Sequence, residues 1–289
     1  MSASILFDSP GPRTIARHRM YTVIAVVVLI AVIAFVLTRL ADAGQFEYDK
    51  WEVFITPRYV EVILGGVLST VQMAFSAILG AVVIGLIFGI GKLSDHGFVR
   101  WPCWAFVEFF RAVPVLLLMV LFYYQFGITR GESGAYWSVV FALTVYNGAV
   151  LAEVFRAGVL AVPRGQAEAA YAMGMRKSQV MMIIQLPQAV KIMIPAIISQ
   201  CVVALKDTSL GYAVTSPGLT AVGKQIYIQF ANHVPTVIVI AAIYITLNLI
   251  LTGIATWVQR RFVGERKIDM YKVGGGMATG ENTGGGGVP

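Results

Sequence analysis

Charged side chains that interrupt apolar stretches are the first candidates for chemistry in this sequence. Glu108 and Arg111 stand three residues apart, as do Glu153 and Arg156, and both pairs lie near the ends of apolar runs. Residues at this spacing meet on one face of a helix, so each pair is expected to form an ion pair. A third polar group, residues 206–209, ends another apolar run.

Apolar runs of about 20 residues can cross a membrane, and charges within such runs serve either a path for a transported molecule or the packing of helices. Ionisable side chains within a membrane face protein or water, which makes them functional candidates. For Arg111 the alternative to substrate contact is a structural ion pair at the membrane boundary. For Lys206 and Asp207 the alternative is mutual neutralisation, and spacing decides neither case. The substrate-path candidates are therefore Lys206, Asp207, Thr208, Ser209 and Arg111.

A soluble segment between two apolar runs, residues 163–187, is too regular to be a simple connection. Residues 166–173 favour a helix, and Gly174 is the residue type that most readily ends one. A second helix over residues 178–186 is predicted to stop at Pro187. Two short helices separated by a glycine form a compact protrusion that fits a groove on another protein.

The composition indicates a protein that crosses a membrane several times. Of its 289 residues, 57% are hydrophobic and 13% charged, and the mean hydropathy is +0.75. Soluble domains carry about 25% charged residues. The net charge of +7 is spread between apolar runs rather than gathered in one patch, which argues against nucleic-acid binding.

The pattern predicts an all-α membrane protein with about six transmembrane helices. The expected spans are residues 21–40, 60–91, 105–128, 135–162, 188–210 and 235–258. A polar lead, residues 1–20, and a basic and then glycine-rich tail, residues 262–289, are expected to be disordered.

The first span has a rival interpretation as a cleaved signal peptide, because Ala41-Asp42-Ala43 resembles a cleavage site. Its apolar run is longer than the usual 7 to 15 residues of a signal, which favours an uncleaved span. In the second span Ala77, Ala81, Gly85 and Gly89 recur every four residues. They predict a smooth stripe on which another helix packs closely.

The segment 163–187 carries a specific resemblance. Glu168-Ala169-Ala170, then Gly174, Ile184 and Leu186-Pro187, stand at the spacing of the EAA loop of bacterial ABC-importer permeases. In that family the loop forms the coupling helices, which dock into a cleft of the cytoplasmic ATPase subunit. The resemblance implies that the residues matching the motif couple this chain to an ATPase: Glu168, Ala169, Ala170, Gly174, Ile184, Leu186 and Pro187. An amphipathic helical hairpin on the surface is the alternative.

Three other segments are similar to the polar amino acid permeases of this family. They are residues 108–116 (EFFRAVPVL), 146–158 (YNGAVLAEVFRAG) and 205–210 (LKDTSL). The first departs from the family pattern at Ala112-Val113, and the second at Gly148 and Val150. The resemblance implies a type I ABC-importer fold that transports a polar amino acid, with glutamate as the first choice and glutamine or aspartate next.

The same resemblance implies the partners. It predicts two ATPase subunits that hold ATP and Mg²⁺, a second permease chain that differs from this one, and an amino-acid-binding protein outside the cell. The phosphate-binding loop G-x-x-x-x-G-K-[ST] is absent from this sequence. The chain is therefore expected to be a permease subunit rather than an enzyme, with no cofactor of its own. The scattered histidines and the two cysteines predict neither a metal site nor a disulfide framework.

The distribution of lysine and arginine predicts the orientation. These residues concentrate in the lead, the turn near Lys92, the segment 163–187 and the segment after residue 258. Cytoplasmic loops carry an excess of such residues, so both termini and the protrusion are expected in the cytoplasm of a bacterium. Glu153 and Arg156, near the inner end of their span, are expected to brace the protrusion.

Two other classes of protein remain open. A secondary transporter driven by an ion gradient would show inverted repeats with broken helices. Only Pro195 and the region of Pro217 point to broken helices, and no repeat is evident. A membrane scaffold without transport activity would need neither the charges at residues 206–207 nor a glycine at residue 174.

Overall fold

The structure is a computed structural model that describes residues 11–263. These residues are almost entirely helical and contain no strand. The predicted tail lies outside the described residues except for its first two positions, which end the last helix.

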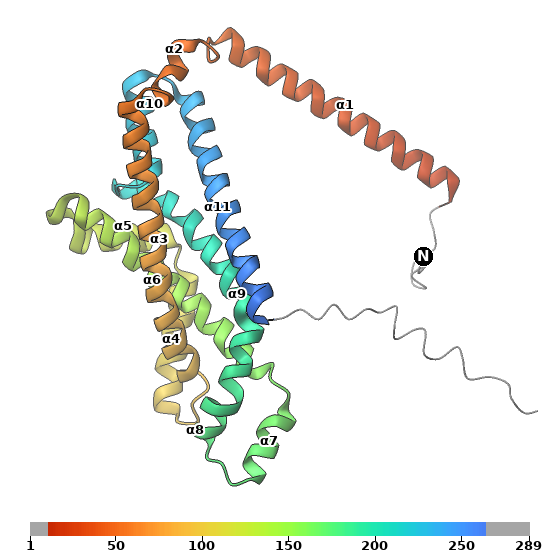
Figure 1. The fold of residues 1–289 in the computed structure, drawn as a ribbon, viewed down its shortest axis with the longest axis vertical. Coiled ribbons are helices and arrows are strands. Elements are labelled where there is room, and N and C mark those ends of the chain that lie inside the picture. The colour runs from red at the N-terminus through yellow and green to blue at the C-terminus, as the bar shows by residue number, and fades with distance from the viewer. Residues whose placement is uncertain (1–10, 264–289) are drawn as a thin grey trace, which may run out of the picture.

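Eight helices of the described chain form the frame of the molecule (Figure 1). They are α1 (Pro12–Asp42), α3 (Pro57–Gly91), α4 (Gly97–Ala112), α5 (Val115–Phe122), α6 (Gly131–Leu160), α9 (Leu186–Asp207), α10 (Leu219–Phe230) and α11 (His233–Val263). Shorter helical segments connect them: α2 (Tyr48–Trp51), η1 (Glu52–Phe54), η2 (Tyr123–Gly127), η3 (Ile128–Arg130), α7 (Arg164–Ala172), α8 (Lys177–Gln179), η4 (Val180–Gln185) and η5 (Thr208–Val214).

Within residues 11–263, five helical stretches are long and apolar enough to cross a membrane. They are Arg13–Asp42, Pro57–Gly91, Val115–Leu160, Lys177–Val214 and His233–Arg261. The difference from the predicted six lies in the third span, residues 105–128, which is divided. Helix α4 ends at Ala112, and α5 continues through η2 and η3 into the region of α6.

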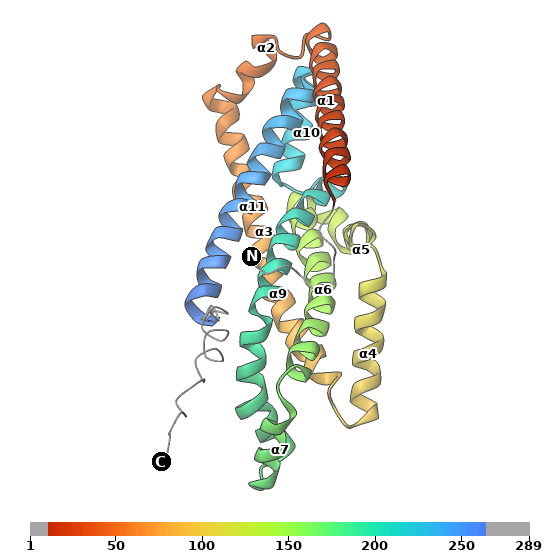
Figure 2. The same ribbon diagram turned by 90° about the vertical axis from the view of Figure 1, so that its right-hand side faces the viewer.

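Pro114 is the physical reason for that division. A proline disfavours helical backbone at the residue before it, and Val113 is extended with φ −80° and ψ 127°. The chain then restarts as α5 immediately after the proline, in a direction that crosses that of α4 (Figure 2). Leu118 and Met119 of α5 are buried against α6 in the central core, together with Val139 and Leu143.

Helix α1 begins earlier than predicted. Residues 12–20, expected to belong to a disordered lead, continue the helix of the first span because Pro12 occupies a favourable first position. Its apolar side chains are exposed around the whole helix, and Figure 1 shows α1 projecting away from the other helices. An all-round apolar surface of this kind requires lipid or another protein around it.

Helices α3 and α6 pack along the predicted stripe of small residues. Ala77, Ala81, Gly85 and Gly89 are all buried, and a Cβ at Gly89 would lie 2.8 Å from the carbonyl oxygen of Ala152. Close contact of this kind lets two helices interdigitate without large side chains. The stripe predicted from the sequence is therefore observed.

Replacing Gly89 with alanine is expected to destabilise the protein by about 1–3 kcal/mol, because backbone atoms of α6 must move. Gly65 on the same helix is the matched control, since a Cβ there meets nothing within 4 Å. Thermal unfolding in detergent is the measurement. Equal melting temperatures for Gly89→Ala and Gly65→Ala would contradict the close packing.

One polar and one apolar contact join α9 and α10 to this pair of helices. The Gln200 side chain of α9 donates a hydrogen bond to Oδ1 of buried Asn147 on α6 at 2.5 Å. Helix α10 packs with α3 and α11 through Leu219, Ile226 and Ile240. In Figures 1 and 2, α7 lies at one end of the elongated bundle and α2 and α10 lie at the opposite end.

Candidate functional site

The protrusion at the α7 end is built around one glycine. Gly174 has φ +80°, a left-handed conformation that L side chains rarely adopt. The amide of Gly174 donates to the carbonyl of Tyr171 at 2.9 Å, and the amide of Met175 donates to that of Ala170 at 3.2 Å. These two bonds form the Schellman motif that ends a helix. The predicted helix end at Gly174 is thus observed, with α7 spanning Arg164–Ala172.

The second predicted helix of this segment does not end where expected. Helical backbone continues through α8, the π-helical turn η4 and α9, so Pro187 lies in the first turn of α9. The π-helical turn η4 directly precedes the proline, and local π adjustments of this kind accommodate a proline within a continuous helix. The protrusion is therefore the short helix α7 followed by α8 and η4, which continue into α9, rather than two separate short helices.

The motif residues divide into an exposed and a covered group. Glu168, Ala169, Gly174 and Pro187 are exposed, whereas Ala170 is buried and Ile184 and Leu186 are half-buried. Four large apolar side chains that the motif does not include are also exposed: Tyr171, Met173, Met182 and Ile183. Tyr171 and Met173 lie on the polar segment before Lys177, where exposed apolar side chains are typical of protein contact surfaces. Met182 and Ile183 lie in the stretch Lys177–Val214, which is long and apolar enough to cross a membrane.

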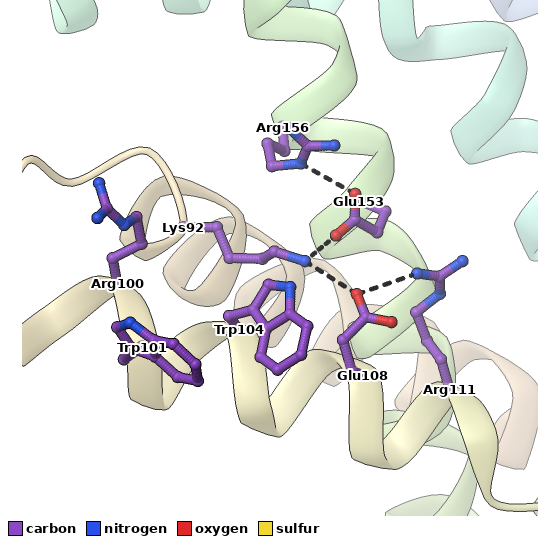
Figure 3. A pocket seen from close by; sticks show the side chains of 8 residues that line it. All are labelled: Lys92, Arg100, Trp101, Trp104, Glu108, Arg111, Glu153 and Arg156. Atoms are coloured by element: carbon purple, nitrogen blue, oxygen red, sulfur yellow. Dashed lines mark hydrogen bonds and ion pairs between the residues drawn. The ribbon is translucent and has the colours of Figure 1, made fainter. Parts of the chain in front are cut away.

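A charged cluster lies where α3, α4 and α6 meet (Figure 3). Both predicted ion pairs are present: Arg111 Nη1 lies 3.6 Å from Glu108 Oε1, and Arg156 Nε lies 3.0 Å from Glu153 Oε2. Lys92, at the C-terminal end of α3, joins them. Its Nζ lies 3.3 Å from Glu108 Oε1 and also contacts Glu153.

Lys92 is the functional candidate that sequence spacing missed. Its side chain is only 6% exposed, and removing one carboxylate partner of such a buried ion pair is destabilising. Glu153 therefore ties α6 to α3 through Lys92, whereas Arg156 pairs with Glu153 within α6. Within residues 11–263, no ion pair joins either residue to the protrusion, which they were expected to brace. The signal in the sequence was a single lysine directly after a long apolar run, but its partners are 16 and 61 residues away.

The protrusion is joined to this region by a second contact. Lys177, at the start of α8, forms an ion pair with Asp95 in the turn between α3 and α4. The hydrogen bond and charge of Lys177 hold the pKa of the Asp95 carboxyl below its usual value. Both side chains are well exposed, so this pair contributes little to stability. It places the turn containing Lys92 beside the protrusion.

The substrate-path candidates do not form one site. Lys206 and Ser209 line a hollow of about 520 Å³ between α9 and α11, together with Tyr244 and Asn248. Thr208 is buried, and its hydroxyl donates to the carbonyl of Leu205 at 2.6 Å.

Arg111 lines the separate hollow of the charged cluster. Within residues 11–263 neither Lys206 nor Asp207 forms an ion pair, so the alternative of mutual neutralisation is not observed. In the Lys206 hollow, the Tyr244 hydroxyl and Asn248 Oδ1 are buried without a hydrogen-bond partner in the described chain. The hollow therefore carries a cation, and two polar atoms without partners among residues 11–263 lie buried in its wall.

Comparison with known proteins identifies the family to which this chain belongs. Residues 81–264 match the family described as the inner membrane component of binding-protein-dependent transport systems. The chain belongs to this family. It is a permease subunit of the polar amino acid ABC-importer type, and it is not itself an enzyme.

Individual relatives agree with that assignment. The permease is 40% identical over 226 residues to the glutamate transport system permease protein GluD of Corynebacterium glutamicum, covering 77% of this chain and 83% of that protein. It is 31% identical over 207 residues to the arginine transport system permease protein ArtQ of Bacillus subtilis, covering 70% and 93%.

A solved structure shares the fold. The permease superposes on a chain of an amino acid ABC transporter crystallised with histidines, with a TM-score of 0.64 and 28% identity, covering 71% of this chain and 95% of that chain. The predicted all-α type I importer fold is thereby confirmed. Permeases of this family work with ATPase subunits and a binding protein, and the multiple membrane helices place this one in a membrane.

Proposed function

We propose that this permease imports glutamate by alternating access, driven by ATP hydrolysis on separate subunits that dock on the protrusion. The exposed α7 with its glycine-ended turn, at one end of the bundle, is the observation that carries the proposal. Exposed Glu168 and Ala169 and the apolar side chains around them supply a contact surface for such a subunit. In this proposal ATP and Mg²⁺ belong to the partner, and this chain needs no cofactor of its own.

Glutamate is the proposed substrate for two reasons. GluD is named for glutamate transport, and a second relative, 25% identical over 225 residues, is the glutamate/aspartate import permease protein GltK of Escherichia coli. An anionic side chain also suits the cation of Lys206 in its polar hollow. Aspartate and glutamine come next, since they differ by a methylene or by one charge.

The proposed assembly pairs this chain with a second, different permease and an external amino-acid-binding protein. Its proposed orientation places both termini and the α7 end in the cytoplasm of a bacterium, because lysine and arginine concentrate in those segments. The α2 and α10 end then faces the binding protein.

Uptake of radiolabelled glutamate tests the proposed function. Cells that lack the gene are compared with cells that regain it, in competition with a panel of unlabelled amino acids. Restored glutamate uptake that survives collapse of the ion gradients but requires ATP is the expected result. Uptake that follows the ion gradient would instead indicate a secondary transporter.

Lys206→Ala is expected to lower glutamate uptake at low substrate concentration by about tenfold, the effect of losing one charge-assisted contact. Lys191→Ala is the matched control, because Lys191 is exposed on the same helix and does not line the hollow. Both variants are expected to reach the membrane in equal amounts. Equal uptake by the two variants would remove Lys206 from the substrate path.

A further inference from the structure

The hollow of the charged cluster carries more positive charge than its ion pairs require. It has a volume of about 630 Å³ and is lined by Lys92, Arg100, Trp101, Trp104, Glu108, Arg111, Glu153 and Arg156. Four of these residues are cationic and only two are anionic, so the lining has an excess of positive charge. An excess of cations in a concave site attracts an anion.

Several donors in this hollow are uncommitted. Arg156 engages Glu153 through Nε, and Arg111 reaches Glu108 with Nη1 alone at 3.6 Å. Arg100 forms no ion pair within the described part of the chain, and the nearby carboxylate of Asp95 is paired with Lys177. Guanidinium groups with free N–H donors are suited to phosphate or carboxylate oxygens.

The surroundings of the hollow indicate which kind of anion it binds. Trp101 and Trp104 line it in an edge-to-face pair with ring centroids 5.6 Å apart, and they are 66% and 48% exposed. Figure 3 shows both rings between Arg100 and Glu108 along α4. Phe98 and Phe109 on the same helix are 92% and 60% exposed. Exposed tryptophans beside cations are typical of the level where lipid headgroups meet hydrocarbon.

We infer that this hollow is a binding site for the headgroup of an anionic phospholipid. The phosphate lies against the free guanidinium donors of Arg100 and its neighbours, and the acyl chains run along the exposed aromatic face of α4. Basic pockets between membrane helices recognise anionic headgroups in this way. A soluble anion would satisfy the arginines but would leave the aromatic face uncovered. The site is separate from the Lys206 hollow and does not depend on the proposed substrate.

Native mass spectrometry of the full chain in detergent tests the site. The protein is incubated with equal amounts of phosphatidylglycerol and phosphatidylcholine that carry the same acyl chains. Preferential retention of phosphatidylglycerol is expected for the wild type. Arg100→Gln is expected to reduce that preference by about fivefold, the effect of one cation near a membrane surface. Arg100→Lys is expected to keep most of it.

Arg58→Gln is the matched control, because Arg58 is an exposed cation on α3 at the end remote from Lys92. It is expected to leave the lipid preference unchanged. Equal retention of the two lipids by the wild type, or equal preference in Arg100→Gln and Arg58→Gln, would overturn the inference. Displacement of phosphatidylglycerol by inorganic phosphate or by glutamate, each at millimolar concentration, would also overturn it, since the hollow would then be a site for soluble anions.

Discussion

Replacing Lys92 with methionine is expected to lower the melting temperature of the permease in detergent by roughly 6–12 °C, which corresponds to about 3 kcal/mol. The methionine fills the space of the lysine stem but removes the cation between Glu108 and Glu153. Glu153 is only 21% exposed and loses one of its two partners. Glu108 is 42% exposed, so water screens the loss of its cationic partner. The expected destabilisation therefore stays at the lower end of the range for buried ion pairs.

The double variant Lys92→Met with Glu153→Gln separates lost charge pairing from lost packing. A neutral glutamine needs no cation, so the double variant is expected to regain at least half of the lost melting temperature. Lys191→Met is the control for removing an exposed lysine and is expected to melt like the wild type. A single variant Lys92→Met that melts like Lys191→Met would show that the cluster does not hold α3, α4 and α6 together.

The charged cluster shows what spacing can and cannot predict. The pairs Glu108–Arg111 and Glu153–Arg156 follow from helical geometry within one element, so the sequence is sufficient for both. Lys92 reaches carboxylates on two other helices, and no local rule relates residues that distant in sequence. The packing of α3 on α6 creates that contact, and it becomes visible only once the helices are placed.

The ends of the helices also include one that the sequence predicts and others that it does not. The end of a helix at Gly174 is predictable because glycine adopts its φ without strain, and the turn is local. Pro187 and Pro114 have the same chemistry but opposite outcomes. Pro114 divides a predicted span because extended backbone at Val113 redirects the chain. Pro187 follows a π-helical turn that accommodates the missing amide, so the helix continues.

The same distinction limits what the sequence implies about transport. The motif over residues 168–187 predicts a partner surface because its residues lie within one short segment of the sequence. The substrate-path candidates are spread over α4, α9 and η5, and the structure separates Arg111 from Lys206. A path that several helices enclose cannot be assembled from the spacing of residues within single segments.

Gly174→Val is expected to weaken retention of the ATPase subunit by about five- to thirtyfold, because a β-branched residue at this φ costs about 1–2 kcal/mol. Nothing lies within 4 Å of a Cβ at Gly174, so the strain is in the backbone rather than in packing. The valine variant is expected to relieve this backbone strain by reshaping the turn after α7. That change displaces the exposed Met173 and Glu168 from the positions in which they would contact the ATPase subunit. Retention of the ATPase during purification of the complex and the rate of uptake are the two measurements.

Two matched variants decide whether that loss comes from the turn. Asparagine tolerates the left-handed conformation, so Gly174→Asn is expected to keep most of the retention. Gly165→Val adds the same side chain near the start of α7, where a Cβ also meets nothing within 4 Å and the backbone is helical. All three variants are expected to insert normally, because none alters a membrane-spanning stretch. If Gly174→Val retained the ATPase as well as Gly174→Asn, the conformation of this turn would not set the docking, and force from ATP hydrolysis would have to enter the bundle elsewhere.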